Sequence, residues 1–236
     1  MSRGRLVVFA KQPLPGAVKT RLAPPFSAAE AAEFYACMLQ DVLAVSASAA
    51  RELDLEAVLA LHPGRAAMEL AREAPAPFRV VAQCGMSLAE RMEWALGEAA
   101  AAGAGPVLLR GSDSPMLAPL QVGAVLDALS EDDVVILPDR DGGYSLVGVA
   151  RPLRGLFEHA MSTRTVAEDT RTSAARMGLS TRFLEASFDV DTVEDLVLLA
   201  ESRRELGDLC PNALSYLDDH HLWRHLDAVA QDRVSG

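Results

Sequence analysis

The fold is indicated first by residues 6–25, whose sequence is LVVFAKQPLPGAVKTRLAPP. Five apolar residues without alternation open this stretch, a pattern typical of a strand covered on both faces. Four prolines follow, and each removes a backbone donor and favours extended geometry in the residue before it. We therefore expect a buried first strand that passes directly into a surface loop.

The loop carries a glycine and several cations that a surface-loop interpretation leaves unexplained. Gly16 lets the backbone approach a bulky group, and Lys19 and Arg21 follow it, with Lys11 at the end of the strand. Arginine offers a planar fork to phosphate oxygens, and lysine offers a point charge. The pattern predicts a nucleotide-phosphate site. The P-loop motif G-x-x-x-x-G-K-[ST] is absent, which argues against a P-loop ATPase.

The length and charge of the chain limit its organisation and partners. Its 236 residues contain no long polar or Gly/Ser-rich linker, so one large domain is favoured. The formal net charge of −11 opposes non-specific binding to nucleic acids and anionic membranes. We expect no nucleic-acid partner, and any phosphate site must be local.

Cysteine usage and hydropathy favour a cytoplasmic protein. The three cysteines are widely spaced and form no C-x-x-C pair, so neither a disulfide framework nor a thiolate metal site is indicated. The apolar run near the N-terminus is shorter than the core of a signal peptide. No segment has the length of a membrane span.

Continuous apolar runs alternate with helical patterns along the chain. The runs lie at 6–10, 55–61, 78–82, 107–110, 133–137 and 144–150, and the later helical patterns at 87–101, 118–129, 164–177 and 192–206. The first helical pattern begins at Ser27, with Glu30 at the spacing of a capping box. This order predicts an α/β fold whose mainly parallel, mixed sheet has helices on both faces and binds ligands beyond the carboxyl ends of its strands.

The end of the chain is expected to form a separate unit. We predict a main domain over residues 1–206 and a helical appendage over 207–236, packed on the domain or on a second subunit. Leu222, Trp223 and Leu226 would give this helix an apolar face, which suits a homodimer.

Two acidic motifs follow expected strands. In GSDSP (111–115), Asp113 either binds a divalent metal or caps the helix that begins near 118. In FDVDT (188–192), Asp189 and Asp191 leave an extended chain on the same face, as ligands of Mg²⁺ or Mn²⁺ would. The alternative is that Asp191 or Thr192 caps the next helix, and both interpretations can hold together.

A third acidic motif, DRDGGYSLVG (139–148), has D-G-G between two apolar runs. That pattern is typical of a hairpin turn, which needs positive φ. Such a turn also brings backbone amides and Asp141 close to a ligand, so we count Asp141 with Asp113 as a catalytic candidate.

Five segments in this order and spacing carry a family resemblance: FAKQPLPGAVKTRL, QCGMSLAERM, RGSDSPML, DGGYSLVG and FDVDTVEDL. Together they resemble the bacterial family of GT-A-like glycosyltransferases described as nucleotide-diphospho-sugar transferases, over about residues 5–200. The resemblance implies a Rossmann-like GT-A fold, which guanylyltransferases that make molybdopterin or phospholactate dinucleotides share.

The resemblance also implies roles for particular residues. It would place nucleotide phosphates on Gly16, Lys19 and Arg21, and a metal on Asp113. The related guanylyltransferases also hold metal with a late aspartate pair, here Asp189 and Asp191. Two further residues, Gln83 and Arg91, would line the same cleft, although a salt bridge on a helix face explains Arg91 equally well.

Three functions stay open at this point. The first is a metal-dependent glycosyltransferase that uses a nucleoside-diphosphate sugar and a small-molecule acceptor. The second is a nucleotidylyltransferase that releases pyrophosphate from a nucleoside triphosphate. The third is a non-catalytic nucleotide-sugar-binding domain. The family's Trp-Ser-Thr stretch reads Met161, Ser162 and Thr163 here, and Arg110 replaces an aliphatic residue, departures that affect the acceptor pocket more than the nucleotide site.

Overall fold

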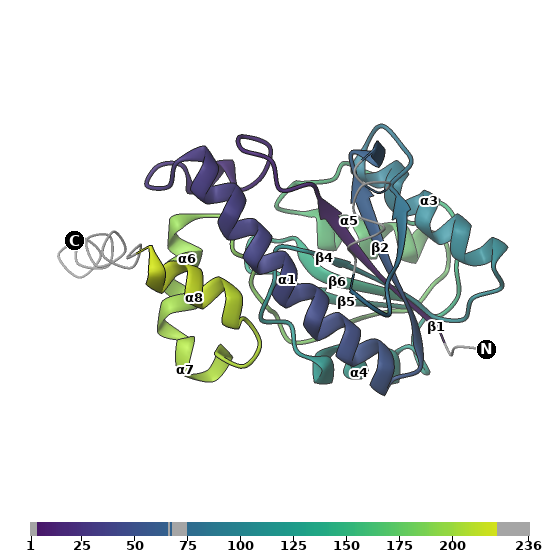
Figure 1. The fold of residues 1–236 in the computed structure, drawn as a ribbon. Coiled ribbons are helices and arrows are strands. Elements are labelled where there is room, and N and C mark those ends of the chain that lie inside the picture. Colours follow the sequence, from purple (N-terminus) through teal and green to yellow (C-terminus); the bar gives the residue numbers. More distant parts are fainter. Residues whose placement is uncertain (1–3, 66, 68–74, 221–236) are drawn as a thin grey trace, which may run out of the picture.

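The computed structural model describes residues 4–65, 67 and 75–220 (Figure 1). The strands are β1 (Gly4–Lys11), β2 (Leu55–His62), β3 (Arg79–Ala82), β4 (Val107–Gly111), β5 (Val134–Pro138), β6 (Tyr144–Val149) and β7 (Thr181–Phe183). The helices are the 3-10 turn η1 (Thr20–Leu22), α1 (Ala28–Glu52), α3 (Leu88–Ala101), α4 (Pro119–Ala128), α5 (Val166–Arg176), α6 (Val193–Glu201), α7 (Arg203–Leu206) and α8 (Pro211–Asp219).

All these strands form one sheet in the order β3-β2-β1-β4-β6-β5-β7. β6 is antiparallel to both of its neighbours, and the other pairs are parallel. The predicted hairpin over 139–143 therefore exists as the turn between β5 and β6. The mixed, mainly parallel sheet is confirmed, and the carboxyl ends of β1, β4 and β5 lie at the same edge.

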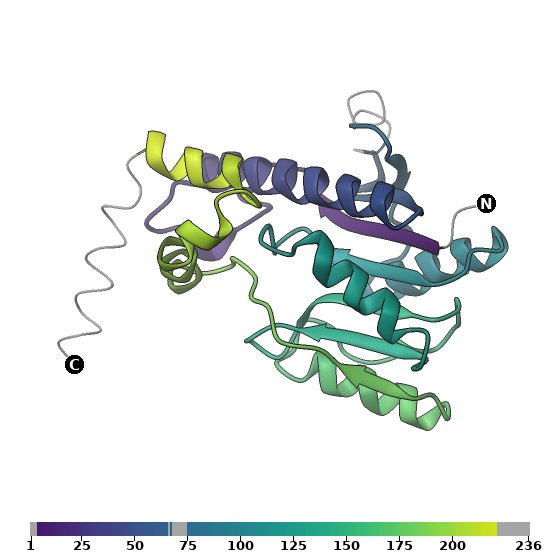
Figure 2. The ribbon, with the colours of Figure 1, turned by 90° about the horizontal axis from the view of Figure 1, so that it is seen from below.

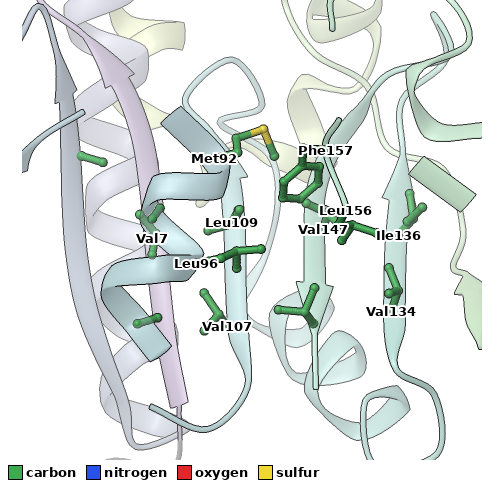
Figure 3. Close-up of a cluster of buried hydrophobic side chains, with 14 of the residues drawn as sticks. Val7, Met92, Leu96, Val107, Leu109, Val134, Ile136, Val147, Leu156 and Phe157 are labelled. Atoms are coloured by element: carbon green, nitrogen blue, oxygen red, sulfur yellow. The ribbon is translucent and has the colours of Figure 1, made fainter. Parts of the chain in front are cut away.

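Helices cover both faces of the sheet because most strands are apolar on both sides. On one face α3 contributes Met92 and Leu96, which pack against Val7, Leu109 and Val147 of the strands (Figure 3). α5 completes this layer. On the other face α1 and α4 cover the alternate strand residues, among them Leu6, Leu108 and Val135.

Local capping signals set the starts of several helices. Ser27 accepts a hydrogen bond from Glu30 N, and Glu30 accepts one from Ser27 N, so the predicted capping box of α1 is present. The same reciprocal pair, Ser87 and Glu90, begins α3. These side chains satisfy backbone donors that the first helical turn leaves free.

The structure differs from the sequence expectation at two places. The sequence does not predict β7, because this strand has three residues, two of them exposed, and so gives no apolar run. The helical pattern at 192–206 forms two helices, α6 and α7, which meet at Ser202. Ser202 belongs to the hydrogen-bond pattern of both helices. Its N–H donates to Leu198 O at the end of α6, and its carbonyl oxygen accepts from Leu206 N of α7.

The described part of the C-terminal segment packs on the domain. In both ribbon views α8 runs beside α1 (Figures 1 and 2). Asp41 of α1 is buried and accepts hydrogen bonds from Asn212 N at 3.1 Å and Ala213 N at 2.8 Å, which caps the start of α8. The boundary at residue 207 and the dimer stay predictions, and the apolar face at 222–226 lies outside the described residues.

The hairpin turn fits tightly against the start of α5, which generates a stability prediction. Gly142 has φ +90°, and a Cβ there would stand 1.8 Å from the carbonyl oxygen of Arg164. Gly142→Ala should therefore lower the free energy of unfolding by roughly 2–4 kcal/mol. Urea denaturation measures this change.

Gly178→Ala is the matched control. Gly178 also has positive φ, +73°, but no atom lies within 4 Å of the position that a Cβ there would take. Gly178→Ala should lower the free energy of unfolding by about 1 kcal/mol, because alanine disfavours positive φ. Equal losses for the two variants would contradict the tight fit at Gly142.

Candidate active site

The candidate site lies at the carboxyl ends of β1, β4 and β5, where the chain segment after β7 crosses the sheet edge. This segment runs along β5, with Leu184 N bonded to Ile136 O and Ser187 N to Pro138 O. It then reaches the loop after β4, where Val190 N donates to Asp113 O at 2.9 Å. Backbone hydrogen bonds thus bring residues 187–191 beside both Asp113 and the hairpin.

Lys19 is the centre of the site. Its Nζ donates to Oδ1 of Asp113 and, at 2.6 Å, to Oδ1 of Asp191. The Lys19 side chain is 2% exposed, whereas the two carboxylates are 45% and 37% exposed. The lysine therefore lies under the two acids, which keep part of their surface open to a ligand.

Electrostatics keep this group charged. Burial disfavours the ammonium, but the two carboxylates outweigh it and raise the pKa of Lys19 well above its ordinary value. Burial also opposes ionisation of Asp191, yet the Lys19 ammonium holds the pKa of that carboxyl below its usual range. Lys19 has φ +47°, a strained conformation for a residue with a side chain, and such strain is often found at functional sites.

Tyr35 of α1 supports the cluster from below. Its hydroxyl accepts from Lys11 N at 3.0 Å and shares a hydrogen bond of 2.7 Å with Ser112 Oγ. Its ring centroid lies 5.9 Å from Lys19 Nζ. Because Tyr35 is buried, these contacts tie the end of β1 to the loop that carries Asp113.

Arg110 also holds that loop. This β4 residue is 1% exposed and donates to Ser46 Oγ at 2.9 Å and to Ser114 O at 2.8 Å, while its Nε has no hydrogen-bond partner among the described residues. Burial lowers the pKa of Arg110 to about 10. The departure seen in the sequence therefore places a buried cation against the backbone of Ser114, the residue after Asp113.

A second acidic group lies beside the first. Carboxylate oxygens of Asp139, Asp141 and Asp189 all lie within 4.8 Å of one another. Burial, and next the charge of Asp189, raise the pKa of Asp139 to about 8. Burial, and next the charge of Asp191, raise the pKa of Asp189 to about 7. These directions follow from several negative charges held together away from water.

The predicted metal set is thus divided between two groups. Asp113 and Asp191 share Lys19, and Asp189 lies with Asp139 and Asp141. Sequence reasoning did not single out Asp139. The available signal was its position two residues before Asp141 at the end of an apolar run, the same spacing that drew attention to Asp189 and Asp191.

Neither Asp113 nor Asp191 is used as a helix cap. Helix α4 begins after Ala118, whose N–H donates to Gln121 Oε1 at 2.9 Å, so Asp113 is not its cap. Of the two residues predicted to cap α6, Thr192 is the N-cap, and its N–H donates to Asp195 Oδ2 at 2.7 Å. The Asp191 carboxylate is therefore left to Lys19.

The remaining predicted cations stand around the open side of the site. Arg21 is 69% exposed, with NH1 4.0 Å from Asp191 Oδ2. Lys11 is exposed at the end of β1, and Gly16 lies in the exposed loop with φ +74° and no neighbouring atom within 4 Å of a Cβ position. The loop thus leaves room for a bulky group beside Arg21.

Gln83 and Arg91 lie nearer the β3 side of the sheet. The Gln83 amide donates to Ala10 O at 3.1 Å and Ala60 O at 2.8 Å, so it joins the ends of β1 and β2. Within the described ranges Arg91 has no salt bridge, and its buried Nε has no hydrogen-bond partner. Burial, then the charges of Arg91 and Lys11, lower the pKa of His62 at the end of β2.

A separate hollow lies on another part of the surface. It has a volume of about 900 Å³ between α3 and residues 154–159, and Glu93, Trp94 and Arg154 are among its lining residues. Glu93 already accepts from Gly155 N and Phe157 N. None of the predicted site residues lines this hollow, so it is separate from the candidate site at the sheet edge.

Comparison with known families identifies the chain. The model of the DUF2064 family, described as an uncharacterized protein conserved in bacteria, matches residues 44–163, just over half of the sequence. The chain belongs to this family. No curated protein sequence gives a significant match to it.

Solved structures confirm the fold of this DUF2064 protein. A "putative nucleotide-diphospho-sugar transferase" from Desulfovibrio desulfuricans G20 is 29% identical, with a TM-score of 0.84 over 96% of this chain and 99% of its own. The 4-diphosphocytidyl-2C-methyl-D-erythritol synthase of Anaerococcus prevotii DSM 20548 is 12% identical, with a TM-score of 0.56 over 85% of this chain and 99% of its own.

At 12% identity the synthase shows only that the fold is shared, and the same holds for a third structure. A cytidylyltransferase from Leptospira borgpetersenii is 12% identical, with a TM-score of 0.53 over 93% of this chain and 95% of its own. The predicted resemblance and the Rossmann-like fold of nucleotide-diphospho-sugar transferases are confirmed, and the comparisons support a transferase. Among the described helices, none has both the length and the hydropathy needed to span a bilayer.

The raised pKa of Asp139 generates a prediction for the metal-free protein. Its folded pKa of about 8 exceeds the unfolded value of about 3.9. Between these pH values the folded chain keeps a proton that the unfolded chain releases, so stability falls as pH rises through this window. Asp139→Asn should remove the loss of stability with rising pH that comes from this carboxyl group.

Thermal unfolding in EDTA measures the effect. Relative to the wild type, Asp139→Asn should raise Tm by about 4 °C or more at pH 8, and the difference should shrink toward pH 4. A constant difference at all pH values would contradict the assigned protonation. Asp127→Asn, on the exposed side of α4, controls for the change in net charge.

Proposed function

We propose that this protein is a metal-dependent glycosyltransferase that uses a nucleoside-diphosphate sugar as donor and transfers the sugar to a small-molecule acceptor. The observation that carries the proposal is Lys19, buried beneath two half-open carboxylates at the carboxyl ends of the strands. Ligands of open α/β sheets bind at such edges. The confirmed fold and the 29% identical neighbour agree with this reaction class.

The residues of the site fit a donor diphosphate together with its metal. Asp113 and Asp191 offer carboxylate oxygens, which Mg²⁺ and Mn²⁺ prefer along with phosphate oxygens. Such an ion would neutralise negative charge on the leaving diphosphate. Asp189, the third residue of the predicted metal set, lies two positions before Asp191 on the same segment.

The chain's own cations would act on the same charge. Arg21 is exposed beside Asp191 and can form two parallel hydrogen bonds to a phosphate. Lys19 fixes the positions of Asp113 and Asp191 in advance, so little reorganisation is needed when charge develops. Gly16 leaves the loop open for the diphosphate, and Lys11 adds a cation at the end of β1.

The acceptor would approach from the hairpin side. Asp141 is exposed, and its Oδ1 accepts from Gly143 N at 2.9 Å, which fixes the side chain at the turn. A carboxylate oxygen of Asp141 lies within 4.8 Å of carboxylate oxygens of Asp139 and Asp189. This proximity supports a role for Asp141 in contacting the acceptor while Asp113 serves the donor.

A specific observation favours nucleotidyl transfer as the second candidate. Two groups of aspartates lie at this sheet edge, a pair that shares Lys19 and a cluster of three, and two groups of carboxylates can serve two metal ions. Transfer from a nucleoside triphosphate, with release of pyrophosphate, involves three phosphates and more negative charge than a diphosphate. The exposed cations Lys11 and Arg21 would then serve the longer phosphate chain, together with Arg91, which has no salt bridge to a described residue.

Product analysis by mass spectrometry separates the candidates. The purified protein with Mg²⁺ or Mn²⁺ is given panels of nucleoside-diphosphate sugars and nucleoside triphosphates. We expect metal-dependent release of a nucleoside diphosphate from one sugar nucleotide. Pyrophosphate release from a triphosphate would instead establish nucleotidyl transfer. Tight binding without turnover over a broad acceptor panel would indicate a binding domain.

Two variants connect turnover to the site. Asp113→Ala should lower the rate at least about 100-fold and abolish metal-dependent nucleotide binding, because the donor metal loses a ligand. Lys19→Met should have a loss of similar size, since Asp113 and Asp191 would repel each other without the ammonium. Asp127→Ala on α4 should retain the wild-type rate. Wild-type nucleotide binding by Asp113→Ala would refute the assignment.

A further inference from the structure

Two sets of carboxylates meet at this sheet edge, and only one of them is neutralised by the described part of the chain. Asp113 and Asp191 share the Lys19 ammonium. None of Asp139, Asp141 and Asp189 forms an ion pair with a described lysine or arginine. Three carboxylate oxygens within 4.8 Å of one another, without a cation, repel strongly in a partly buried position.

A buried polar atom without a partner marks the centre of this second group. Asp139 is 9% exposed, and its Oδ1 is shielded from solvent with no hydrogen-bond donor within the described part of the chain. Ser145, on β6 directly after the turn, is 3% exposed, and its hydroxyl also has no hydrogen-bond partner among the described residues. Buried polar atoms in folded proteins normally have partners, so the free Oδ1 indicates a missing ligand.

The backbone leaves space at this point. Gly143 has no side chain, and a Cβ there would stand 3.1 Å from Asp141 Oδ1 and 3.8 Å from Asp139 Oδ2. Both carboxylates therefore gather over a position that a larger residue would fill. A parallel backbone β-bridge between Asp139 and Ser187 holds the hairpin beside the 187–191 segment.

We infer that Asp139, Asp141 and Asp189 bind a divalent cation of their own, distinct from the donor metal assigned to Asp113 and Asp191. All available ligand atoms are oxygens, which selects a hard cation such as Mg²⁺, Mn²⁺ or Ca²⁺ over zinc or copper. The cation joins the hairpin to the segment after β7. It binds without nucleotide, because the protein alone supplies its three carboxylates.

This inference extends the proposed function at one point. If the enzyme transfers a sugar or nucleotidyl group, Asp141 contacts the acceptor through this cation, whose remaining positions are open on the exposed side of the hairpin. The cation site itself does not depend on that reaction. Failure to find a substrate would leave it intact, and its absence would leave donor turnover through Asp113 possible.

The test measures Mn²⁺ binding by electron paramagnetic resonance in the absence of nucleotide. The wild type should bind Mn²⁺, with Mg²⁺ and Ca²⁺ as competitors. Asp139→Asn and Asp141→Asn should each weaken binding at least 10-fold. The surface variant Asp127→Asn should bind within about 2-fold of the wild type, because Asp127 is exposed on α4 and lies outside the cluster.

Thermal unfolding provides the second readout and checks folding. Mn²⁺ should raise Tm of the wild type and of Asp127→Asn, and this increase should be lost in Asp139→Asn and Asp141→Asn. The last two variants should fold in EDTA, since each replaces a repelled charge with a neutral side chain of similar shape. The inference is overturned if the wild type binds no Mn²⁺, if the cluster variants bind like the wild type, or if Asp113→Asn alone loses binding.

Discussion

The site depends on one buried ammonium. Lys19 lies 94 residues before Asp113 and 172 residues before Asp191, yet its Nζ contacts both carboxylates. Without such partners, a lysine at this position would either lose its proton or keep its side chain in solvent. The loop after β1, the loop after β4 and the segment before α6 therefore hold one another through this charge. Tyr35 and Arg110 fix the residues on either side of Asp113 from the core, which gives the site a rigid floor.

The two acidic groups differ in how their charge is balanced. Lys19 balances Asp113 and Asp191, whereas no described lysine or arginine forms an ion pair with Asp139, Asp141 or Asp189. The antiparallel β6 makes this second group possible, because the hairpin returns the chain at the sheet edge and leaves Asp139 and Asp141 there. A parallel connection would have carried the chain away through a helix.

Six of the strands could be predicted from continuous apolar runs, the starts of α1 and α3 from their helical patterns, and the hairpin from D-G-G. These features are local, because the period of apolar residues, a capping side chain and a turn glycine act on their immediate neighbours. The short strand β7 and the break at Ser202 escaped, since tertiary hydrogen bonds rather than local pattern define them.

Most of the candidate residues could also be named from the sequence, but their partners could not. The folded structure shows that Lys19 pairs with Asp113 and Asp191, that Asp189 lies with Asp139 and Asp141, and that Gln83 joins β1 to β2. These contacts join residues far apart in the chain, and they arise from strand order and register. A charged side chain pairs with whichever group of opposite charge the folded backbone brings near it. A local sequence pattern cannot show which distant residue that will be.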